Sequence, residues 1–419
     1  MGRSGLSRRS LIQSAIAAGA ASAAAPASAQ SLVNKLFKGG RGEWQDKFDA
    51  ELSDQAKVID RVPVINRDSV ELMENAVRRH SQIVASGGWP EVSSKKALKL
   101  GKKDPAVEMI RRRLIVSGDI EPRSGKTEVF DSYVDAAVRR FQERHGLIAD
   151  GIAGRDTIIA MNVPATTRLE QLQVNLVRMR TMAGFLGNRY VMVNIPAAEV
   201  EAVDFNRVAT RHTAVVGKID RQTPILNSKI HQINFNPYWT VPKSIIRKDL
   251  IPKMREEPSY LDDNKIRIFA PDGSQLNSQQ INWNSEEALS YRFTQEPGYE
   301  NSMGTMKINF HNPHAVYMHD TPSKTLFGEN FRFHSSGCVR VQNIREFAAW
   351  LAKDDKDLAA DEFDRIVRSG ERIDYAIKKP VPVYFVYFTA WATHSGVDHF
   401  RDDIYERDAG DGVQLTQQG

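Results

Sequence analysis

The chain has 419 residues, of which 41% are hydrophobic and 26% are charged, and its formal net charge is +5. This length is too great for one ordinary core and favours two or three domains of soluble globular protein. The nearly balanced charge gives no support for nucleic-acid binding. Beyond the N-terminus, no apolar run approaches the roughly eighteen residues of a membrane helix. The only cysteine, Cys338, excludes an internal disulfide.

Residues 1–29 have the pattern of an export signal. Arg3, Arg8 and Arg9 precede a weakly apolar, alanine-rich run that ends in the small-x-small sequence Ala27-Ser28-Ala29. The stretch SRRSLI resembles a twin-arginine signal, and an ordinary secretory signal is the alternative. Both interpretations predict export, to a bacterial periplasm, of a soluble or peripheral protein. Removal of the three arginines lowers the net charge to +2.

The next segment, 30–93, suggests helices over Trp44–Ala56 and Ser69–Ala85, followed by a break at 87–90, and no function follows from it. At the other end of the chain, residues 401–419 form a polar tail.

Residues 94–163 predict three short helices joined by glycine turns. Asp104 and Pro105 suit the N-cap and first position of a helix, and Gly146 suits the end of the second helix. The order of residues here resembles the peptidoglycan-binding type 1 domain, and this resemblance implies binding of glycan strands. The same positions also serve as core and turn residues of a three-helix scaffold, so the binding role is an analogy. The residues that carry the resemblance are Gly101, Asp104, Val107, Leu114, Val138, Phe141, Gln142, Gly146, Leu147, Asp150, Gly151, Gly154 and Thr157.

A linking helix is expected over 164–188, capped by Thr166 or Thr167. Strand patterns then dominate 189–400, and a more helical, polar stretch at 243–299 is expected to be a lid-like insertion. The predicted fold class is therefore α+β and multidomain, with a small helical bundle and a mainly β domain.

Three interpretations of Cys338 follow from the residues alone. A buried inert thiol is one, although an unpaired thiol in an oxidising compartment is exposed to oxidation. A metal site from His311, His314, His319, His334 and Cys338 is another, but the spacing matches no zinc pattern. The third is a thiol nucleophile with His319 as its base. His319 follows an apolar strand, and the long loop after it can return the chain so that Cys338 lies beside His319.

The stretch YMHDTP, followed by a loop and SSGCVRV, resembles the signature of YkuD-type L,D-transpeptidases. Further stretches between 190 and 400, among them INFNPYWTVPKSI and PGYENSMGTMKINF, resemble the large branch of that family, which carries a peptidoglycan-binding domain. Many members have histidine where this chain has Ser336, which leaves His319 as the only base of the motif. His334 does not match the position of the family's base and is expected to be a loop residue.

The resemblance implies a set of roles and no metal or organic cofactor. Cys338 is the nucleophile and His319 is the base, which the carbonyl of Asp320 or another acceptor orients through the other ring nitrogen. The backbone N–H groups of Gly337 and Cys338 form an oxyanion hole with the Tyr317 hydroxyl, although Tyr317 also suits a core position. The implied substrate-binding residues are Arg340, Trp239, Asn301 and Ser336, with Ser302 beside the cleft, and a core role for Trp239 is the alternative.

The implied reaction is acyl transfer from a peptidoglycan tetrapeptide stem. Cys338 forms a thioester, D-alanine leaves, and the amine of a neighbouring stem completes a 3→3 cross-link. Carbapenems are expected to acylate the same thiol. The residues leave the acceptor open: water, a free D-amino acid or a lipoprotein lysine would each use the same donor chemistry. A non-catalytic scaffold that binds the cell wall is the alternative from another class.

Overall fold

A computed structural model describes residues 61–122, 128–298, 300–355, 358 and 360–409. All of these residues belong to one compact unit. The expected signal at 1–29 and the expected helix at Trp44–Ala56 lie outside the described residues. Within the described ranges, no helix has both the length and the apolar character needed to cross a membrane.

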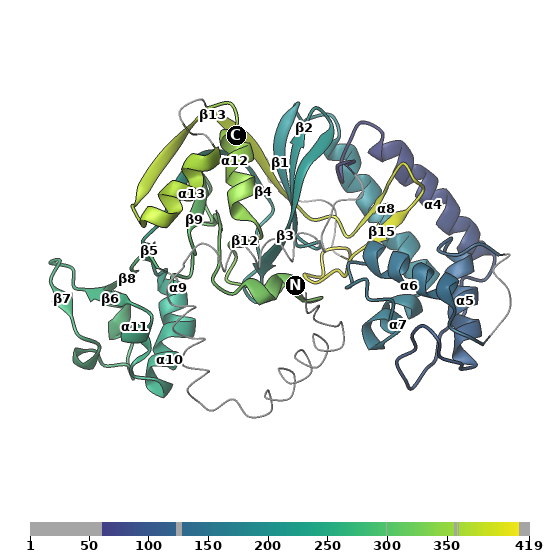
Figure 1. The fold of residues 1–419 in the computed structure, drawn as a ribbon, viewed down its shortest axis with the longest axis horizontal. Helices are drawn as coiled ribbons and strands as arrows, with labels where there is room; N and C mark the ends of the chain where they lie inside the picture. Colours follow the sequence, from purple (N-terminus) through teal and green to yellow (C-terminus); the bar gives the residue numbers. More distant parts are fainter. Residues whose placement is uncertain (1–60, 123–127, 299, 356–357, 359, 410–419) are drawn as a thin grey trace, which may run out of the picture. The chain divides into compact units, whose positions relative to one another are not determined.

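The N-terminal part of the described chain is helical (Figure 1). Its helices are α4 (Ser69–Ala85), α5 (Ala106–Val116), α6 (Ser132–Arg144), α7 (Arg155–Asn162) and α8 (Ala165–Met182). The helices α5, α6 and α7 enclose a small core of their own, to which Val107, Ile110 and Phe141 contribute fully buried side chains. Helices α4 and α8 pack against each other and share a second core with β1, β14 and β15.

The ends of these helices test the sequence predictions. The bounds of α4 are confirmed, and the break after it contains Gly87 and Gly88 at positive φ. Helix α5 begins one residue later than expected, with the carboxylate of Asp104 accepting from the N–H of Ala106 at 2.9 Å. The predicted threonine cap of α8 was wrong, because the fixed φ of Pro164 starts the helix and places both threonines inside its first turn.

The C-terminal part is built on one mixed sheet of nine strands, in the order β11-β3-β12-β10-β9-β4-β13-β1-β2. Strand β2 also pairs with β3, so the sheet closes on itself. Helices α12 (Ile344–Ala352) and α13 (Ala360–Ser369) pack against it, and Phe347, Phe363 and Phe385 lie in the core between them. The strands are β1 (Arg189–Asn194), β2 (Glu199–Asp204), β3 (Arg207–Gly217), β4 (Leu226–Phe235), β9 (Met306–Phe310), β10 (Met318–His319), β11 (Phe333–Ser335), β12 (Val339–Val341) and β13 (Ile373–Val386).

Buried and partly exposed side chains alternate along β9, and this alternation determines which residues face the candidate site. Met306, Ile308 and Phe310 are buried in the core of the sheet, while Lys307 and Asn309 point to its other face.

A short hairpin, β14 (Ala390–Ala392) with β15 (Asp398–Phe400), follows β13 and returns the chain to the N-terminal helices.

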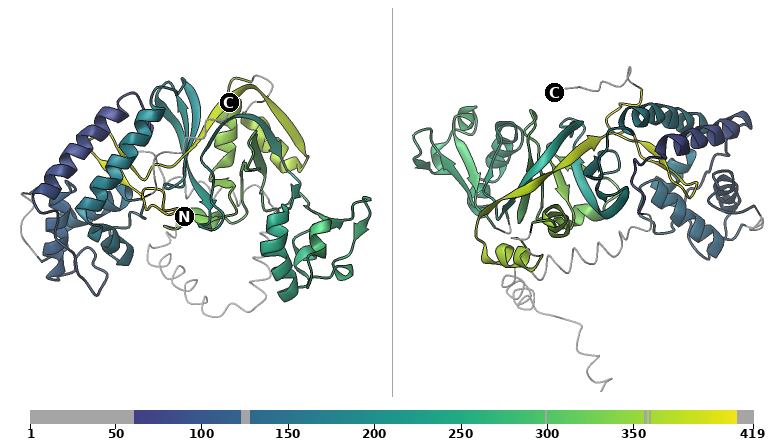
Figure 2. Two further views of the ribbon diagram at one scale, coloured as in Figure 1. Left: turned by 180° about the vertical axis from the view of Figure 1, so that it is seen from behind. Right: turned by 90° about the horizontal axis from the view of Figure 1, so that it is seen from above.

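The stretch expected as a lid is a separate subdomain with a hydrophobic core that includes Val241, Ile251, Ile268 and Phe293 (Figure 2). It is less helical than expected, because it also contains a four-stranded sheet in the order β5-β8-β6-β7. Its elements are β5 (Trp239–Thr240), α9 (Lys243–Ile245), η1 (Ile246–Leu250), α10 (Ile251–Glu256), α11 (Tyr260–Asp263), β6 (Ile266–Phe269), β7 (Gln275–Leu276), η2 (Ser278–Gln280), η3 (Glu287–Ser290) and β8 (Arg292–Gln295).

Candidate active site

The residues expected to carry the chemistry meet on one face of the large sheet. Strand β10 runs parallel to β12, and His319 lies opposite Arg340 in this pair. The same register, continued two residues towards the N-terminus, places Tyr317 opposite Cys338. Because side chains alternate along a strand, Tyr317 and His319 share a face with Cys338 and Arg340. Strand β9 adds Lys307 to this face, directly opposite His319. Three adjacent strands therefore present a thiol, an imidazole, a phenol and two cations together.

The thiol of Cys338 is partly buried, and burial raises its pKa. Hydrogen bonds from the backbone and the hydroxyl of Tyr317 act in the opposite direction, as do the charges of Lys307 and Arg340. The resting thiol is therefore protonated, but its surroundings contain the donors and cations that a thiolate requires.

His319 is only 7% exposed, and burial together with the nearby Arg340 lowers its pKa to about 3. The ring is therefore neutral near pH 7 and able to accept a proton. The Asp320 backbone partly opposes this lowering of the pKa. However, Nδ1 of His319 has no hydrogen bond of normal geometry to any of the described residues.

The carboxylate of Asp320 fixes the loop that follows His319. It is 1% exposed, receives Lys324 Nζ at 2.7 Å, and accepts from the N–H and the hydroxyl of Thr305, each at 2.9 Å. Lys324 and these hydrogen bonds hold the pKa of Asp320 below its ordinary value, although burial alone would raise it. Gly304 permits this close approach, because a Cβ there would lie 2.4 Å from the carboxylate.

The loop that presents Cys338 is held by its own polar groups. Gly337 has a φ of +113°, and its N–H donates to Ser335 Oγ at 3.1 Å. The Ser335 hydroxyl donates to the carbonyl of Cys338 at 2.5 Å, and Thr223 Oγ1 donates to the carbonyl of Gly337 at 2.9 Å. The Gly337 N–H, expected in an oxyanion hole, is thus engaged with Ser335 in this structure.

Ser336 is exposed, and its hydroxyl accepts from Arg221 Nη1 at 2.9 Å. Arg221 also forms a two-point ion pair with Asp249 of η1. One guanidinium group therefore joins the cysteine loop to the inserted subdomain. The ion pair raises the pKa of Arg221, so the link stays charged.

Three other expected residues lie beside this site. Trp239 donates from Nε1 to the Tyr317 hydroxyl at 3.2 Å and lines a cleft of about 380 Å³ between β5 and the helices of the insertion. Ser302 lines the same cleft. Asn301 is fully buried and donates to the carbonyls of Pro237 and Glu296 at 3.0 and 2.9 Å, so it braces the wall of the cleft.

Histidines from the metal interpretation have other surroundings. His311 stacks on His231 with ring centroids 4.2 Å apart, and His334 contacts Glu329 at 3.2 Å. Across the described part of the chain, no three side chains of His, Cys, Asp or Glu gather as a metal ion would require.

Sequence reasoning missed Lys307, Arg221 and Lys324. Alternation in MKINF was a signal for Lys307, since an isolated lysine between core residues must point to the opposite face. Arg221 had no local signal, because its partner Asp249 lies 28 residues away and only the fold brings the two together. Lys324 lies four residues after its partner Asp320, so its signal was this spacing.

Comparison with known proteins decides the family. Residues 188–370 match the YkuD family, described as the L,D-transpeptidase catalytic domain. The chain contains a YkuD domain. Residues 103–161 match a second family, described as "Putative peptidoglycan binding domain". The chain thus combines a helical peptidoglycan-binding region with a mainly β YkuD domain, as the sequence predicted.

A curated relative from Haemophilus influenzae, named "Putative L,D-transpeptidase", is 30% identical over 240 residues. The alignment covers 57% of this chain and 48% of that protein, so the chain spans about half the length of its curated relative.

Among solved structures, an L,D-transpeptidase from Mycobacterium smegmatis is 14% identical, with a TM-score of 0.24 over 48% of this chain and 58% of that one. One from Stackebrandtia nassauensis is 12% identical, with a TM-score of 0.26 over 71% and 96%. TM-scores this low carry no argument about the site.

Proposed function

We propose that this protein is a periplasmic cysteine acyltransferase that forms 3→3 cross-links in peptidoglycan. The observation that carries the proposal is the geometry of the paired strands β12 and β10: Cys338 directly precedes β12, His319 ends β10, and both lie on one face with Lys307 and Arg340. The YkuD and peptidoglycan-binding domains support the same substrate class and an association with the cell wall.

In the first step, the sulfur of Cys338 attacks the carbonyl carbon of the third residue of a tetrapeptide stem, and His319 accepts the thiol proton. Tyr317 donates its hydroxyl hydrogen bond to the charge that develops. The C–N bond to the terminal D-alanine then breaks, and the imidazolium returns the proton to the departing amine.

In the second step, the side-chain amine of a neighbouring stem attacks the thioester carbonyl. His319 takes a proton from this amine, the C–S bond breaks, and the thiol of Cys338 is regenerated. A free D-amino acid, a lipoprotein amine or water in place of the second stem gives exchange, protein attachment or carboxypeptidase activity by the same steps.

The charge of Arg340 makes the pKa of His319 depend on whether a substrate is bound. Arg340 lowers the pKa of His319, and its own Nε has no hydrogen-bond partner among the described residues. A substrate carboxylate bound to Arg340 offsets this charge, so the pKa of His319 rises as the substrate arrives. The base therefore becomes stronger once there is an acyl group to transfer.

The test is intact-protein mass spectrometry with a purified disaccharide-tetrapeptide. We expect a thioester adduct and released D-alanine with the native protein, no adduct with Cys338→Ala, and loss of both with His319→Gln. The control is His334→Gln, because His334 lies near the cysteine loop but pairs with Glu329. Native behaviour of both active-site variants would refute the mechanism, and silence of all four proteins would favour a non-catalytic scaffold.

The same assay separates the acceptors and tests inhibition. Cross-linked dimers identify a stem acceptor, whereas tripeptides identify water. A carbapenem is expected to add its full mass to the native protein and to His334→Gln, but not to Cys338→Ala.

A further inference from the structure

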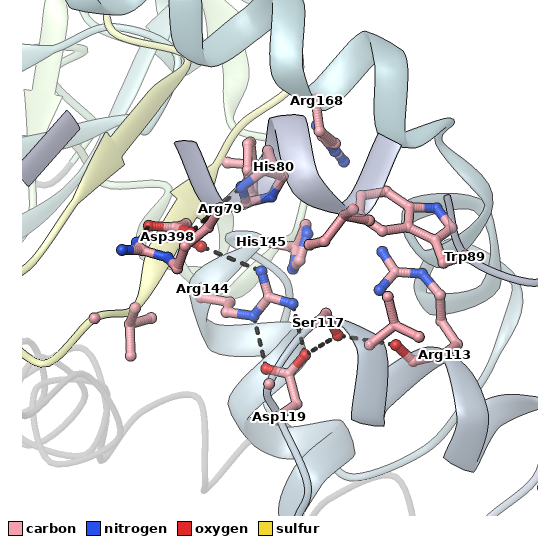
Figure 3. A pocket seen from close by; sticks show the side chains of 16 residues that line it. Arg79, His80, Trp89, Arg113, Ser117, Asp119, Arg144, His145, Arg168 and Asp398 are labelled. Atoms are coloured by element: carbon pink, nitrogen blue, oxygen red, sulfur yellow. Dashed lines mark hydrogen bonds and ion pairs between the residues drawn. The ribbon is translucent and has the colours of Figure 1, made fainter. Parts of the chain in front are cut away.

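A second pocket, with a volume of about 200 Å³, lies far along the chain from the Cys338 site (Figure 3). Helices α4, α5, α6 and α8, with β15, supply its walls. Four arginines line it, and three of these, Arg113, Arg144 and Arg168, are each at most 7% exposed. So many buried guanidinium groups around one cavity require negative partners.

The two carboxylates that line the pocket are already paired. Arg144 holds Asp119 through two hydrogen bonds of 2.7 and 2.6 Å, and it also donates to the carbonyl of Asp398 at 3.2 Å. The carboxylate of Asp398 receives Arg79 at 2.6 Å. Figure 3 shows both pairs beside the cavity.

Arg113 is the first cation in the pocket without an acidic partner. It is 1% exposed, its Nε donates to the carbonyl of Met161 at 2.8 Å, and its guanidinium stacks 3.8 Å from the ring of Trp89. No described carboxylate lies within ion-pair distance of it, and its buried Nη1 has no hydrogen-bond partner in the described structure. Burial and the charge of Arg144 lower the pKa of Arg113 to about 9.

Arg168 is the second such cation. It is 4% exposed, donates to Gln171 Oε1 at 2.8 Å and stacks 4.9 Å from the ring of Phe400. Its Nε also lacks a hydrogen-bond partner among the residues that the structure describes. Burial and the charge of Arg144 lower the pKa of Arg168 to about 10, although the charge of Asp402 acts in the opposite direction. Near pH 7 the guanidinium groups of Arg113 and Arg168 both remain charged.

A buried charge without a counter-charge destabilises a folded protein, and an anion bound from solvent removes that cost. The pocket is open to such a ligand, since the lining residues Val116 and Val397 are 37% and 36% exposed. Asp119 and Asp398 repel a compact dianion such as hydrogen phosphate, whereas a single carboxylate group meets two guanidinium groups that each have a nitrogen without a partner among the described residues. The ring of Trp89 supplies an apolar wall for the carbon atoms attached to it.

We propose that this pocket binds a carboxylate carried by a peptide, held between the guanidinium groups of Arg113 and Arg168. The inference rests on the proposed function in one respect: peptidoglycan stems are the peptides that would supply the carboxylate. The peptidoglycan-binding bundle contributes Arg113, while Arg168 belongs to the helix that leads into the YkuD domain. A bound peptide would therefore connect the two domains.

The test is calorimetric titration of the full chain with the dipeptide L-alanyl-γ-D-glutamate, which lacks the diamino acid that acyl transfer needs. We expect saturable binding to the native protein and about tenfold or greater loss of affinity in Arg113→Gln and in Arg168→Gln. Matched controls are Arg112→Gln and Arg180→Gln on the same two helices, whose side chains are 58% and 55% exposed. Both controls should bind as the native protein does.

Two further ligands sharpen the result. The bis-amide of the dipeptide should not bind, and inorganic phosphate should bind more weakly than the dipeptide. Equal affinities in the pocket variants and the controls, equal binding of the bis-amide, or no binding at all would overturn the proposal. Tighter binding of phosphate would overturn the peptide part and assign a site for free anions.

Circular dichroism establishes that each variant is folded. If Arg113→Gln unfolds because the bond to Met161 is lost, Arg168→Gln and Arg113→Lys carry the test, with the same losses expected. Release of D-alanine from a tetrapeptide is measured on the same samples. If the pocket variants keep both normal D-alanine release and unaltered dipeptide affinity, the pocket proposal alone is refuted. If the pocket variants selectively lose dipeptide affinity while no protein, including the native one, releases D-alanine, the proposed function alone is refuted.

Discussion

Replacement of Tyr317 by phenylalanine tests the local electrostatics of the nucleophile. The Tyr317 hydroxyl hydrogen-bonds the sulfur of Cys338 and accepts from Trp239, and the substitution removes only this oxygen. A hydrogen bond to a charged group contributes about 1.5–3 kcal/mol, so the loss of this hydrogen bond raises the pKa of the thiol. The thiolate fraction near pH 7 should then fall about ten- to hundredfold.

The rate of alkylation of Cys338 by iodoacetamide, measured from pH 6 to 10, reports this fraction directly. Tyr238→Phe is the matched control, because Tyr238 is 48% exposed and lies beside Trp239 in sequence. We expect the alkylation profile of Tyr317→Phe to move to higher pH and that of the control to stay in place. Superimposable profiles for the native protein and Tyr317→Phe would show that the phenol does not stabilise the thiolate.

Three other changes probe the frame around the site. Arg221→Gln should lower kcat/KM for the tetrapeptide about tenfold with little change in melting temperature. If this loss comes from the ion pair, the double variant Arg221→Gln with Asp249→Asn should be no less active than Arg221→Gln alone. Burial lowers the pKa of His212 to about 4 from 6.5, so the unfolded chain binds this proton first and the free energy of unfolding falls as pH drops from 6.5 towards 4. His212 should contribute about 3 kcal/mol of this loss, and the free energy of unfolding of His212→Asn, measured by urea titration, should not show this contribution. The same dependence of the free energy of unfolding on pH in the native protein and the variant would count against the assignment. Lys324→Met leaves Asp320 buried without its cation and should cost about 3–5 kcal/mol in urea unfolding, and a loss below about 1 kcal/mol would show that Thr305 suffices.

Sequence patterns predicted the elements whose residues interact locally. Helix α4 has the predicted bounds because Met73 and Ala76 repeat at helical spacing and the glycines after Ala85 stop it. The pairing of β10 with β12 also brings the motif residues Cys338 and His319 to one edge of a single loop excursion, as a strand, a loop and a returning strand predict.

The remainder depends on contacts that no local pattern contains. The small sheet of the insertion pairs β5 with β8 across more than fifty residues, and its short strands of two to four residues have little periodicity. The link between Arg221 and Asp249 exists only because the loop that contains Arg221 folds against η1 of the insertion. Similarly, Arg113 and Arg168 are ordinary helix residues in the sequence, and only the packing of α5 and α8 around one cavity makes them a pair.

The position of β13 in the sheet changes how the protein should be divided. The match to the YkuD family ends at residue 370, yet β13 begins at Ile373 and lies between β4 and β1. A fragment that stopped at 370 would lose an interior strand and leave β1 and β2 attached to the rest only through β3. Tyr405 lies farther still along the chain, and its hydroxyl donates to the carbonyl of Gly217 at 2.6 Å. The unit that folds is therefore longer than the unit that homology detects, and an excised catalytic fragment needs the chain at least as far as Tyr405.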